Sequence, residues 1–245
     1  MVKQDESNNQ TLKSSERRER AHRILDAAAV LIARWGYNKT NVEDIAKQAG
    51  VGKGTIYLHW KTRDELFRAL IQRERLLMVT DFKQRISEDP AGATLHGIYK
   101  HYALALTQRP LLKAFILRDS EALGKFAQGE HGTAALVERL AGFTAHLEFL
   151  RAHGLVRTDI SVQEQVYILG SIMMGFYFIA PLMPPELTLA DERLATLMAE
   201  TVQRALESDR SPSVEELQTI SQAFIEQLDR GIALYEAQFQ KELDA

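Results

Sequence analysis

The chain has 245 residues, 45% of them hydrophobic, which is enough for one large domain or two modest domains with a buried core. It contains no cysteine, which excludes disulfides and thiolate zinc sites and is compatible with a reducing cytoplasm. The net charge of −3 is unevenly distributed: residues 1–63 hold 12 Lys or Arg against 7 Asp or Glu, and the remainder holds 18 against 26. A basic first segment joined to an acidic remainder is typical of a modular DNA-binding protein.

The N-terminal region predicts a tail followed by a helix. Residues 1–13 are polar and lack the apolar run of a signal peptide, so we expect a disordered tail and a cytoplasmic protein. From residue 14, apolar residues recur at helical spacing, which predicts an amphipathic helix. Its inward side, expected to form a small core with Ile45, Ile56 and Trp60, consists of Ala21, Ile24, Ala28, Leu31 and Trp35.

Two short helices with a sharp turn between them follow. Asn41, with Asp44 three residues later, has the pattern of a helix N-cap and its partner. Gly50 supplies the residue that leaves this helix with a positive φ angle. A second short helix is predicted from Gly52 to about His59. This arrangement is that of a helix-turn-helix, whose second helix enters the major groove of DNA.

The second helix carries side chains suited to DNA. Gly52, Lys53 and Gly54 leave its first turn nearly bare, so that backbone N–H groups can approach a phosphate. Lys53 can reach a base edge, and Tyr57 lies one turn further on. On local chemistry alone, a surface helical hairpin with solvated charges remains the alternative. Further donors at the rim of this helix are Thr55, His59, Lys61 and Arg63.

The segment from about Arg20 to Leu70 resembles the DNA-binding domain of the TetR family of transcriptional regulators. The resemblance implies that Thr40, Thr55, His59 and Arg63 contact phosphates, and that Lys53 and Tyr57 face bases or the adjoining backbone. Gly52 departs from the family pattern, in which a Ser cap is commoner. The matching residues are Gly36 to Ala46, Ala49 to Val51, Lys53 to Tyr57, Trp60 and Arg63 to Leu66.

Residues 63–245 predict a larger body made only of helices, so the fold class expected is all-α: a helix-turn-helix head in residues 14–62 and a helical effector-binding and dimerisation body. Thr62 with Glu65, and Ser161 with Glu164, have the spacing of capping boxes. The first body helix contains no Gly or Pro and joins head and body as a rigid rod. The helices expected are 63–87, one starting at Pro90, 111–118, 133–153, 161–183, 188–208 and 213–240.

The helix 161–183 is unusually apolar. Val166 to Met183 is an uncharged run just long enough to span a membrane. Its interior glycines, Pro181 and flanks without a Lys or Arg bias favour a soluble helix instead, and we expect no membrane partner. One side would face the body and another would pair with a second copy of the chain, as an exposed apolar patch often does. The side assigned to the homodimer interface contains Ile168, Ile172, Gly175 and Ile179.

A pocket for a small effector is predicted inside the body, on compositional grounds. Aromatic rings, methionines and a few polar groups should converge there, as in many ligand sites. The alternative is that these side chains only fill the core. The ligand expected is largely hydrophobic, aromatic or acyl, with a polar group near Arg118 or His146. The residues assigned to the pocket are Tyr99, Tyr102, Phe115, Arg118, Phe143, His146, Leu147, Met173 and Tyr177.

No enzyme, cofactor or metal motif is found in the sequence. The nucleophile elbow GxSxG, the Walker A loop and the dinucleotide fingerprint GxGxxG do not occur, and the histidines are too scattered for a metal site. We therefore expect a homodimeric DNA-binding regulator; the resemblance implies a repressor that a small effector releases from a palindromic operator. The alternatives are a regulator whose body binds a partner protein and, more remotely, an enzyme.

Overall fold

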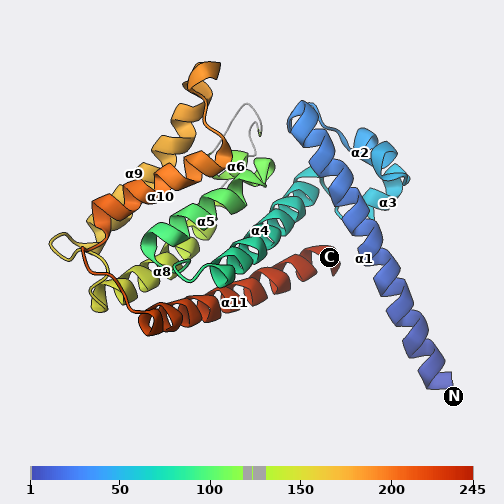
Figure 1. The fold of residues 1–245 in the computed structure, drawn as a ribbon. Helices are drawn as coiled ribbons and strands as arrows, with labels where there is room; N and C mark the ends of the chain where they lie inside the picture. Colours follow the sequence, from blue (N-terminus) through green and yellow to red (C-terminus); the bar gives the residue numbers. More distant parts are fainter. Residues whose placement is uncertain (1, 118–122, 124–130, 245) are drawn as a thin grey trace.

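A computed structural model describes residues 2–117, 123 and 131–244, with side chains for residues 15–117, 123 and 142–243. Every element in this part of the chain is a helix, and one isolated bridge joins Val156 to Glu207. A small head of helices lies at the N-terminal end, beside a larger helical body (Figure 1). The all-α fold with a helix-turn-helix head and a helical body is therefore confirmed.

The head contains α1 (Val2–Trp35), α2 (Val42–Ala49), α3 (Lys53–Tyr57) and the first turns of α4 (Arg63–Glu88). α1 extends back to Val2, so the structure draws as helix most of the segment, residues 1–13, that was expected to be a disordered tail. The physical reason is that neither Gly nor Pro interrupts the sequence between residues 2 and 35.

The core of the head is built from one side of each of its helices. Ile24, Ile45 and Ile56 are almost fully buried, and Trp60 is 2% exposed, as the sequence predicts. Trp35 was expected in this core but is 40% exposed. It is the last residue of α1, where the chain turns away, and the guanidinium of Arg34 lies 5.8 Å from its ring centroid.

The body packs around α5 (Leu95–Thr107), which lies between α4 and α10 (Asp191–Leu206). Two elements, α6 (Pro110–Ile116) and α8 (His131–Ala152), complete its first half. α11 (Val214–Asp244) runs back along α4 towards the head (Figure 1).

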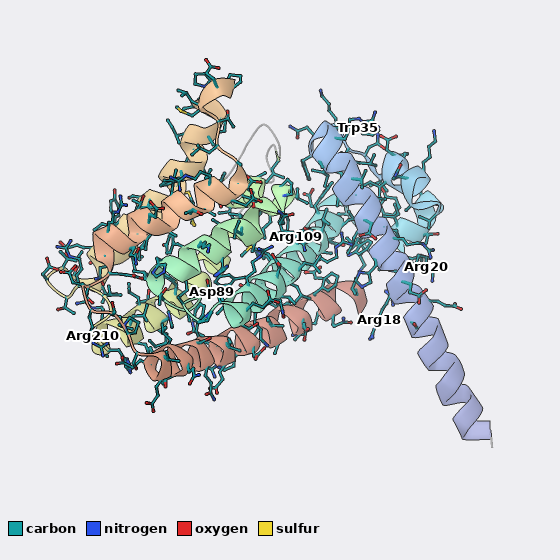
Figure 2. The ribbon with its side chains drawn as sticks, in the orientation of Figure 1. Arg18, Arg20, Trp35, Asp89, Arg109 and Arg210 are labelled. Carbon is teal, nitrogen blue, oxygen red and sulfur yellow. The ribbon has the colours of Figure 1, made fainter. Side chains whose placement is uncertain are left out.

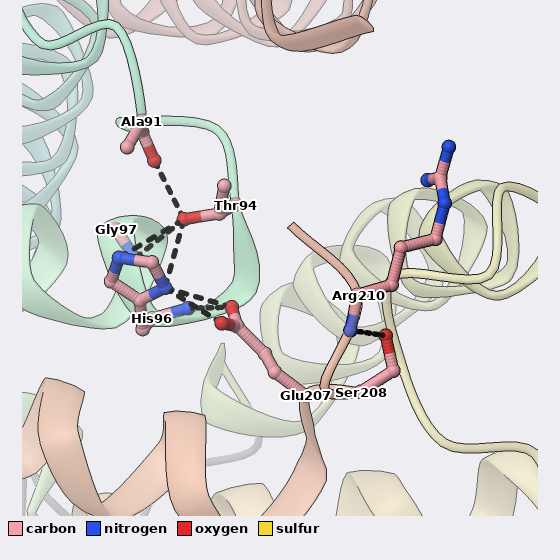
Figure 3. Close-up of polar contacts among 7 residues, drawn as sticks. All are labelled: Ala91, Thr94, His96, Gly97, Glu207, Ser208 and Arg210. Carbon is pink, nitrogen blue, oxygen red and sulfur yellow. Dashed lines mark hydrogen bonds and ion pairs between the residues drawn. The ribbon is translucent and has the colours of Figure 1, made fainter. Parts of the chain in front are cut away.

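The N-terminus of α5 shows how residues far apart in sequence close the body (Figure 3). α5 begins after Thr94 rather than at Pro90, because the Thr94 hydroxyl accepts a hydrogen bond from the Gly97 N–H at 3.2 Å. The carboxylate of Glu207, at the end of α10, accepts a hydrogen bond from the His96 N–H at 2.9 Å and also contacts its ring. A Cβ atom at Gly97 would lie 2.3 Å from the Ala91 carbonyl oxygen, so only glycine fits there.

α9 (Val162–Ile179), followed by the short helices η2 (Ala180–Leu182) and η3 (Pro185–Leu187), projects from one end of the body (Figure 1). Its capping box between Ser161 and Glu164 is present as predicted. The segment Val162–Leu182 is long and apolar enough to cross a membrane by length and composition alone, and little of it is buried in the chain. This helix therefore packs on the body with one side, and much of its other apolar surface has no covering partner among the described residues.

Candidate DNA-binding site

Local hydrogen bonds shape the helix-turn-helix. The side chain of Asn41 accepts a hydrogen bond from the Asp44 N–H at 2.8 Å, which caps α2. Gly50 has a φ angle of 66°, and its N–H returns to the last carbonyls of α2. Thr62 caps α4 by accepting a hydrogen bond from the Glu65 N–H at 3.1 Å. All three interactions join residues three or four positions apart, so the sequence predicts them correctly.

α3 presents its exposed side chains on a nearly bare surface. Gly52 caps it without a side chain, and a Cβ atom at Gly54 would meet nothing within 4 Å. Lys53 and Tyr57 are both exposed and lie together, with the Lys53 ammonium 5.9 Å from the Tyr57 ring centroid. Lys53 also forms an ion pair with Glu43 of α2, whose hydrogen bond raises the pKa of the lysine. The pair that was predicted to read bases is thus accessible.

The rim residues differ in what they can reach. Lys61 is exposed and Thr55 is half-buried. The guanidinium of Arg63 lies 4.2 Å from the Tyr37 ring centroid and donates a hydrogen bond to the Thr40 carbonyl oxygen at 3.1 Å. Arg63 therefore joins the start of α4 to the loop before α2, in addition to carrying a positive charge near the site.

Thr40 and His59 were expected to contact phosphates, but both side chains are buried in this chain. Thr40 is 0% exposed, and its hydroxyl donates a hydrogen bond to the Gly36 carbonyl oxygen at 2.9 Å. His59 is 4% exposed and packs beside Trp60. Burial, followed by the charges of Arg17 and Arg20, lowers the pKa of His59, so at neutral pH it adds no charge to the site.

A group of arginines on α1 also lies near the helix-turn-helix, although the sequence did not predict these arginines as part of the DNA-binding site. Arg17 and Arg20 lie close enough to His59 for their charges to affect its titration. Arg18 and Arg20 are labelled on α1 in Figure 2, which shows them on the segment that passes the helix-turn-helix. The Nε atom of Arg20 is buried without a hydrogen-bond partner among the described side chains. The signal was the run Arg17-Arg18-Glu19-Arg20, which extends the positive field of the head beyond α3.

The structure brings most of the predicted pocket residues into one region of the body. Tyr99, Leu147 and Tyr177 belong to its buried core, and half-buried Tyr102, Phe115, Phe143 and Met173 pack against that core. His146 is also buried, but its ring contacts Phe224 of α11 at a centroid distance of 4.2 Å and its Nε2 bonds the Ala93 carbonyl oxygen. It therefore faces α11 and not the space between α5 and α9. Arg118 lies outside the described residues.

The residues of the predicted dimer face differ in how far the chain itself covers them. Ile168 and Ile172 are half-buried against the body core, whereas Gly175 and Ile179 are exposed. Within this helix and its short extension η2, the most exposed large apolar residues lie on an adjoining side: Tyr167 is 78% exposed, Phe178 is 56% exposed and Leu182 is 74% exposed. We call Tyr167, Phe178, Ile179 and Leu182 the α9 face.

Comparison with known proteins points to one family. Residues 24–70 match the family described as "Bacterial regulatory proteins, tetR family". The Fatty acid metabolism regulator protein of Bacillus subtilis is 38% identical over 74 residues, which cover 30% of this chain and 36% of that protein. An HTH-type transcriptional regulator of Staphylococcus aureus is 36% identical over 67 residues, again 36% of its length. The chain thus spans about a third of the length of the curated relatives that it matches.

Solved structures extend the similarity to the body. SmeT, described as the repressor of the Stenotrophomonas maltophilia multidrug efflux pump SmeDEF, aligns with a TM-score of 0.58 at 22% identity, covering 77% of this chain and 91% of SmeT. Its triclosan complex aligns with a TM-score of 0.62 at 23% identity, covering 80% and 96%. NalD, the secondary repressor of the Pseudomonas aeruginosa MexAB-OprM pump, gives 0.54 at 19% identity, covering 80% and 100%. These similarities show a shared fold.

Proposed function

Because this chain belongs to the TetR family of transcriptional regulators, we propose that it binds a palindromic operator as a homodimer and represses transcription until a small hydrophobic effector releases it. The observation that carries the proposal is the capped helix-turn-helix, which holds Lys53 and Tyr57 exposed on α3. The family makes the chain a DNA-binding regulator and not an enzyme. We place it in the cytoplasm, where its operator would be.

Lys53 and Tyr57 are proposed to read the operator. The ion pair between Lys53 and Glu43 is exposed on both sides, with 48% and 59% of the two side chains accessible, so it adds little stability and DNA can replace it. Lysine donates to the O6 and N7 atoms of guanine in the major groove. Lys61, Arg63 and the arginines of α1 would supply the sequence-independent attraction to phosphates.

We expect Lys53→Ala and Tyr57→Ala each to weaken binding to a selected operator by about 1–3 kcal/mol, because each removes a contact to bases. Fluorescence anisotropy with a duplex selected by the wild-type protein from a random library measures the change. Lys47→Ala removes an exposed lysine of α2 and is the matched control for the loss of one positive charge. An operator that Lys53→Ala binds as tightly as the wild type would show that Lys53 does not read bases.

The α9 face is proposed to pair with the same face of a second copy. The opposite side of α9 anchors the helix to the body. Leu169 and Tyr177 are buried there, and the Tyr177 hydroxyl donates a hydrogen bond to the Ala103 carbonyl oxygen at 3.3 Å. A Cβ atom at Gly175 would meet nothing within 4 Å in this chain, so the backbone is open to a neighbouring helix. A two-fold pairing covers identical apolar faces and brings two heads to one palindrome.

The effector is proposed to bind between α5, α6 and α9. The phenolic oxygen of Tyr102 is buried and has no hydrogen-bond partner among the described residues, which leaves a polar group for a ligand to meet. The Lys113 ammonium lies nearby, 5.0 Å from the Tyr177 ring centroid. An apolar ligand with a hydroxyl or acidic group suits these residues. The triclosan complex of SmeT supports the choice of a halogenated phenol as the first probe.

A continuous chain of side chains joins this region to the head. Arg109 precedes α6, and its Nη1 atom lies 3.5 Å from a carboxylate oxygen of Glu74 on α4. Arg73 lies 3.5 Å from the other oxygen of Glu74, and its Nη1 atom lies 2.7 Å from Asp26 of α1. Figure 2 labels Arg109 where α5 ends near α4. A ligand that moves α6 would therefore pull on α1 through α4, which is unbroken from Arg63 to Glu88.

We expect triclosan to weaken operator binding, and operator DNA to weaken triclosan binding by the same factor, because linkage between two sites is reciprocal. Calorimetric titration of triclosan with and without the selected duplex measures both affinities. Tyr102→Phe should lower the affinity for triclosan by about 1 kcal/mol through loss of one hydrogen bond, and should leave DNA affinity unchanged. Equal affinities in the two titrations would make triclosan a passenger, and binding of a protein partner by the body would then become the better hypothesis.

A further inference from the structure

α11 is part of two separate hydrophobic cores. In its first half, Ile220 and Phe224 are 1% and 4% exposed and belong to the core of the body. The ring of Phe224 lies 6.0 Å from that of Phe82 on α4 and 4.2 Å from that of His146 on α8. Gln227 donates a hydrogen bond to the Gly142 carbonyl oxygen at 2.6 Å. The beginning of α11 is therefore fixed to the body.

The other end of α11 is buried in the head. Phe239 and Leu243 are 3% and 1% exposed and belong to the same core as Ile24 and Leu70. The ring of Phe239 lies 5.7 Å from the ring of His22 on α1, at an interplanar angle of 64°. The carbonyl oxygen of His22 in turn accepts a hydrogen bond from Arg73 of α4 at 3.3 Å. At this point α1 is thus held by α4 and α11 together.

Between its two ends, α11 contacts α4 and little else. Lys83 of α4 forms an ion pair with Asp229, whereas Leu234 is 54% exposed. A Cβ atom at Gly231 would meet nothing within 4 Å. A helix of 31 residues is about 46 Å long, so α11 spans the distance between the two cores as one stiff element.

Two stiff connections restrain the head more than one does. Without α11, the head is joined to the body by α4 and by the contact of α6 with α1, and a rotation of the head about the α4 axis would meet less resistance. α11 lies beside α4 and inserts two apolar side chains into the head, so such a rotation would expose Phe239 and Leu243 to water.

We propose that Phe239 and Leu243 are positioning residues: the end of α11 holds the DNA-binding head at a fixed orientation on the body, and thereby sets the half-site spacing that the regulator accepts. The second part of this proposal rests on the proposed binding of a dimer to a palindrome. The first part does not, because both contacts lie within one chain.

The orientation is tested by distance measurement in the free protein. Because the chain has no cysteine, spin labels can be placed only at introduced cysteines, Lys47→Cys in the head and Glu148→Cys in the body. Labelled chains are mixed with an excess of unlabelled chains, so that pulsed electron resonance reports the distance within one chain. We expect a narrow distribution for the wild type and for the control Leu234→Ala, and a broader, shifted distribution for Phe239→Ala/Leu243→Ala. An unchanged distribution in the double variant would overturn the proposal.

Amide hydrogen exchange across α2 and α3 shows whether the head of each variant remains folded. If the double variant loses protection from exchange in α2 and α3, the distance is measured in Leu243→Ala, which removes less apolar surface. An unchanged distance distribution in Leu243→Ala would then overturn the proposal. Phe239→Leu keeps an apolar side chain in the head and should restore the narrow distribution.

The spacing is tested with DNA. The duplex selected by the wild type is remade with one base pair added or removed at its centre, which rotates the half-sites by about a tenth of a helical turn. The wild type should lose about tenfold or more in affinity, whereas the double variant should bind all three duplexes with similar affinity. A double variant that discriminates as the wild type does would refute the role in spacing. A wild-type protein that binds as a monomer would refute the dimer proposal, and the distance measurement would still decide the orientation.

Discussion

Phe178→Asp is expected to separate the dimer into monomers and to lower affinity for a two-half-site operator by roughly 10²–10⁴-fold, the gain that linking two binding events commonly provides. Phe178 is 56% exposed in the single chain, so the substitution leaves the body core intact. In a dimer paired through the α9 face, the same carboxylate would be buried against apolar side chains without a partner, which is strongly unfavourable.

Sedimentation velocity and binding to the selected duplex measure the two effects. Val214→Asp is the matched control, because Val214 is 73% exposed at the start of α11, away from the α9 face. Ile172→Glu should also give monomers, but Ile172 is half-buried against the body core, so that variant tests folding and association together. A Phe178→Asp variant that sediments as a dimer would show that another surface forms the interface. A membrane-bound wild type would show that lipid covers this face instead.

The body is expected to lose stability in mild acid because of His146. Burial lowers the pKa of His146 to about 4 from an ordinary value of 6.5, and its hydrogen bond to the Ala93 carbonyl oxygen opposes the shift only in part. The folded state therefore holds the neutral ring, and the unfolded chain binds a proton near pH 6.5. The stability that this preference contributes is complete above about pH 6.5 and is lost as the pH falls towards 4. A difference of about 2.5 units corresponds to about 3 kcal/mol.

Urea unfolding at pH 7.5 and pH 4, at one protein concentration because dimer stability depends on it, measures this loss. In His146→Gln, which can still donate a hydrogen bond to Ala93, the difference between the two pH values should shrink by about 3 kcal/mol. His153→Gln, which replaces an exposed histidine just after α8, is the matched control. The same pH difference in the wild type and in His146→Gln would contradict the assignment.

The sequence by itself determined the local structure of this protein and the family resemblance of its head. The caps at Asn41, Thr62 and Ser161 and the positive φ angle at Gly50 depend on residues within a few positions of each other, so their physics is present in the sequence. The exposed pair Lys53 and Tyr57 follows from the same local pattern. The sequence analysis also expected one side of α9 to face the body, and Leu169 and Tyr177 of that helix are buried.

Tertiary structure alone decided which helix faces which. His59 was expected at the polar rim, and the family resemblance implied a phosphate contact for Thr40, but the packing of the head encloses both side chains. His146 was assigned to the effector site, yet it faces Phe224, 78 positions further along the chain. Phe239 shows the same limit most clearly, because it is buried in the head beside His22, more than 200 positions away along the chain. An amphipathic helix specifies that one side needs an apolar partner, and only the folded chain selects that partner.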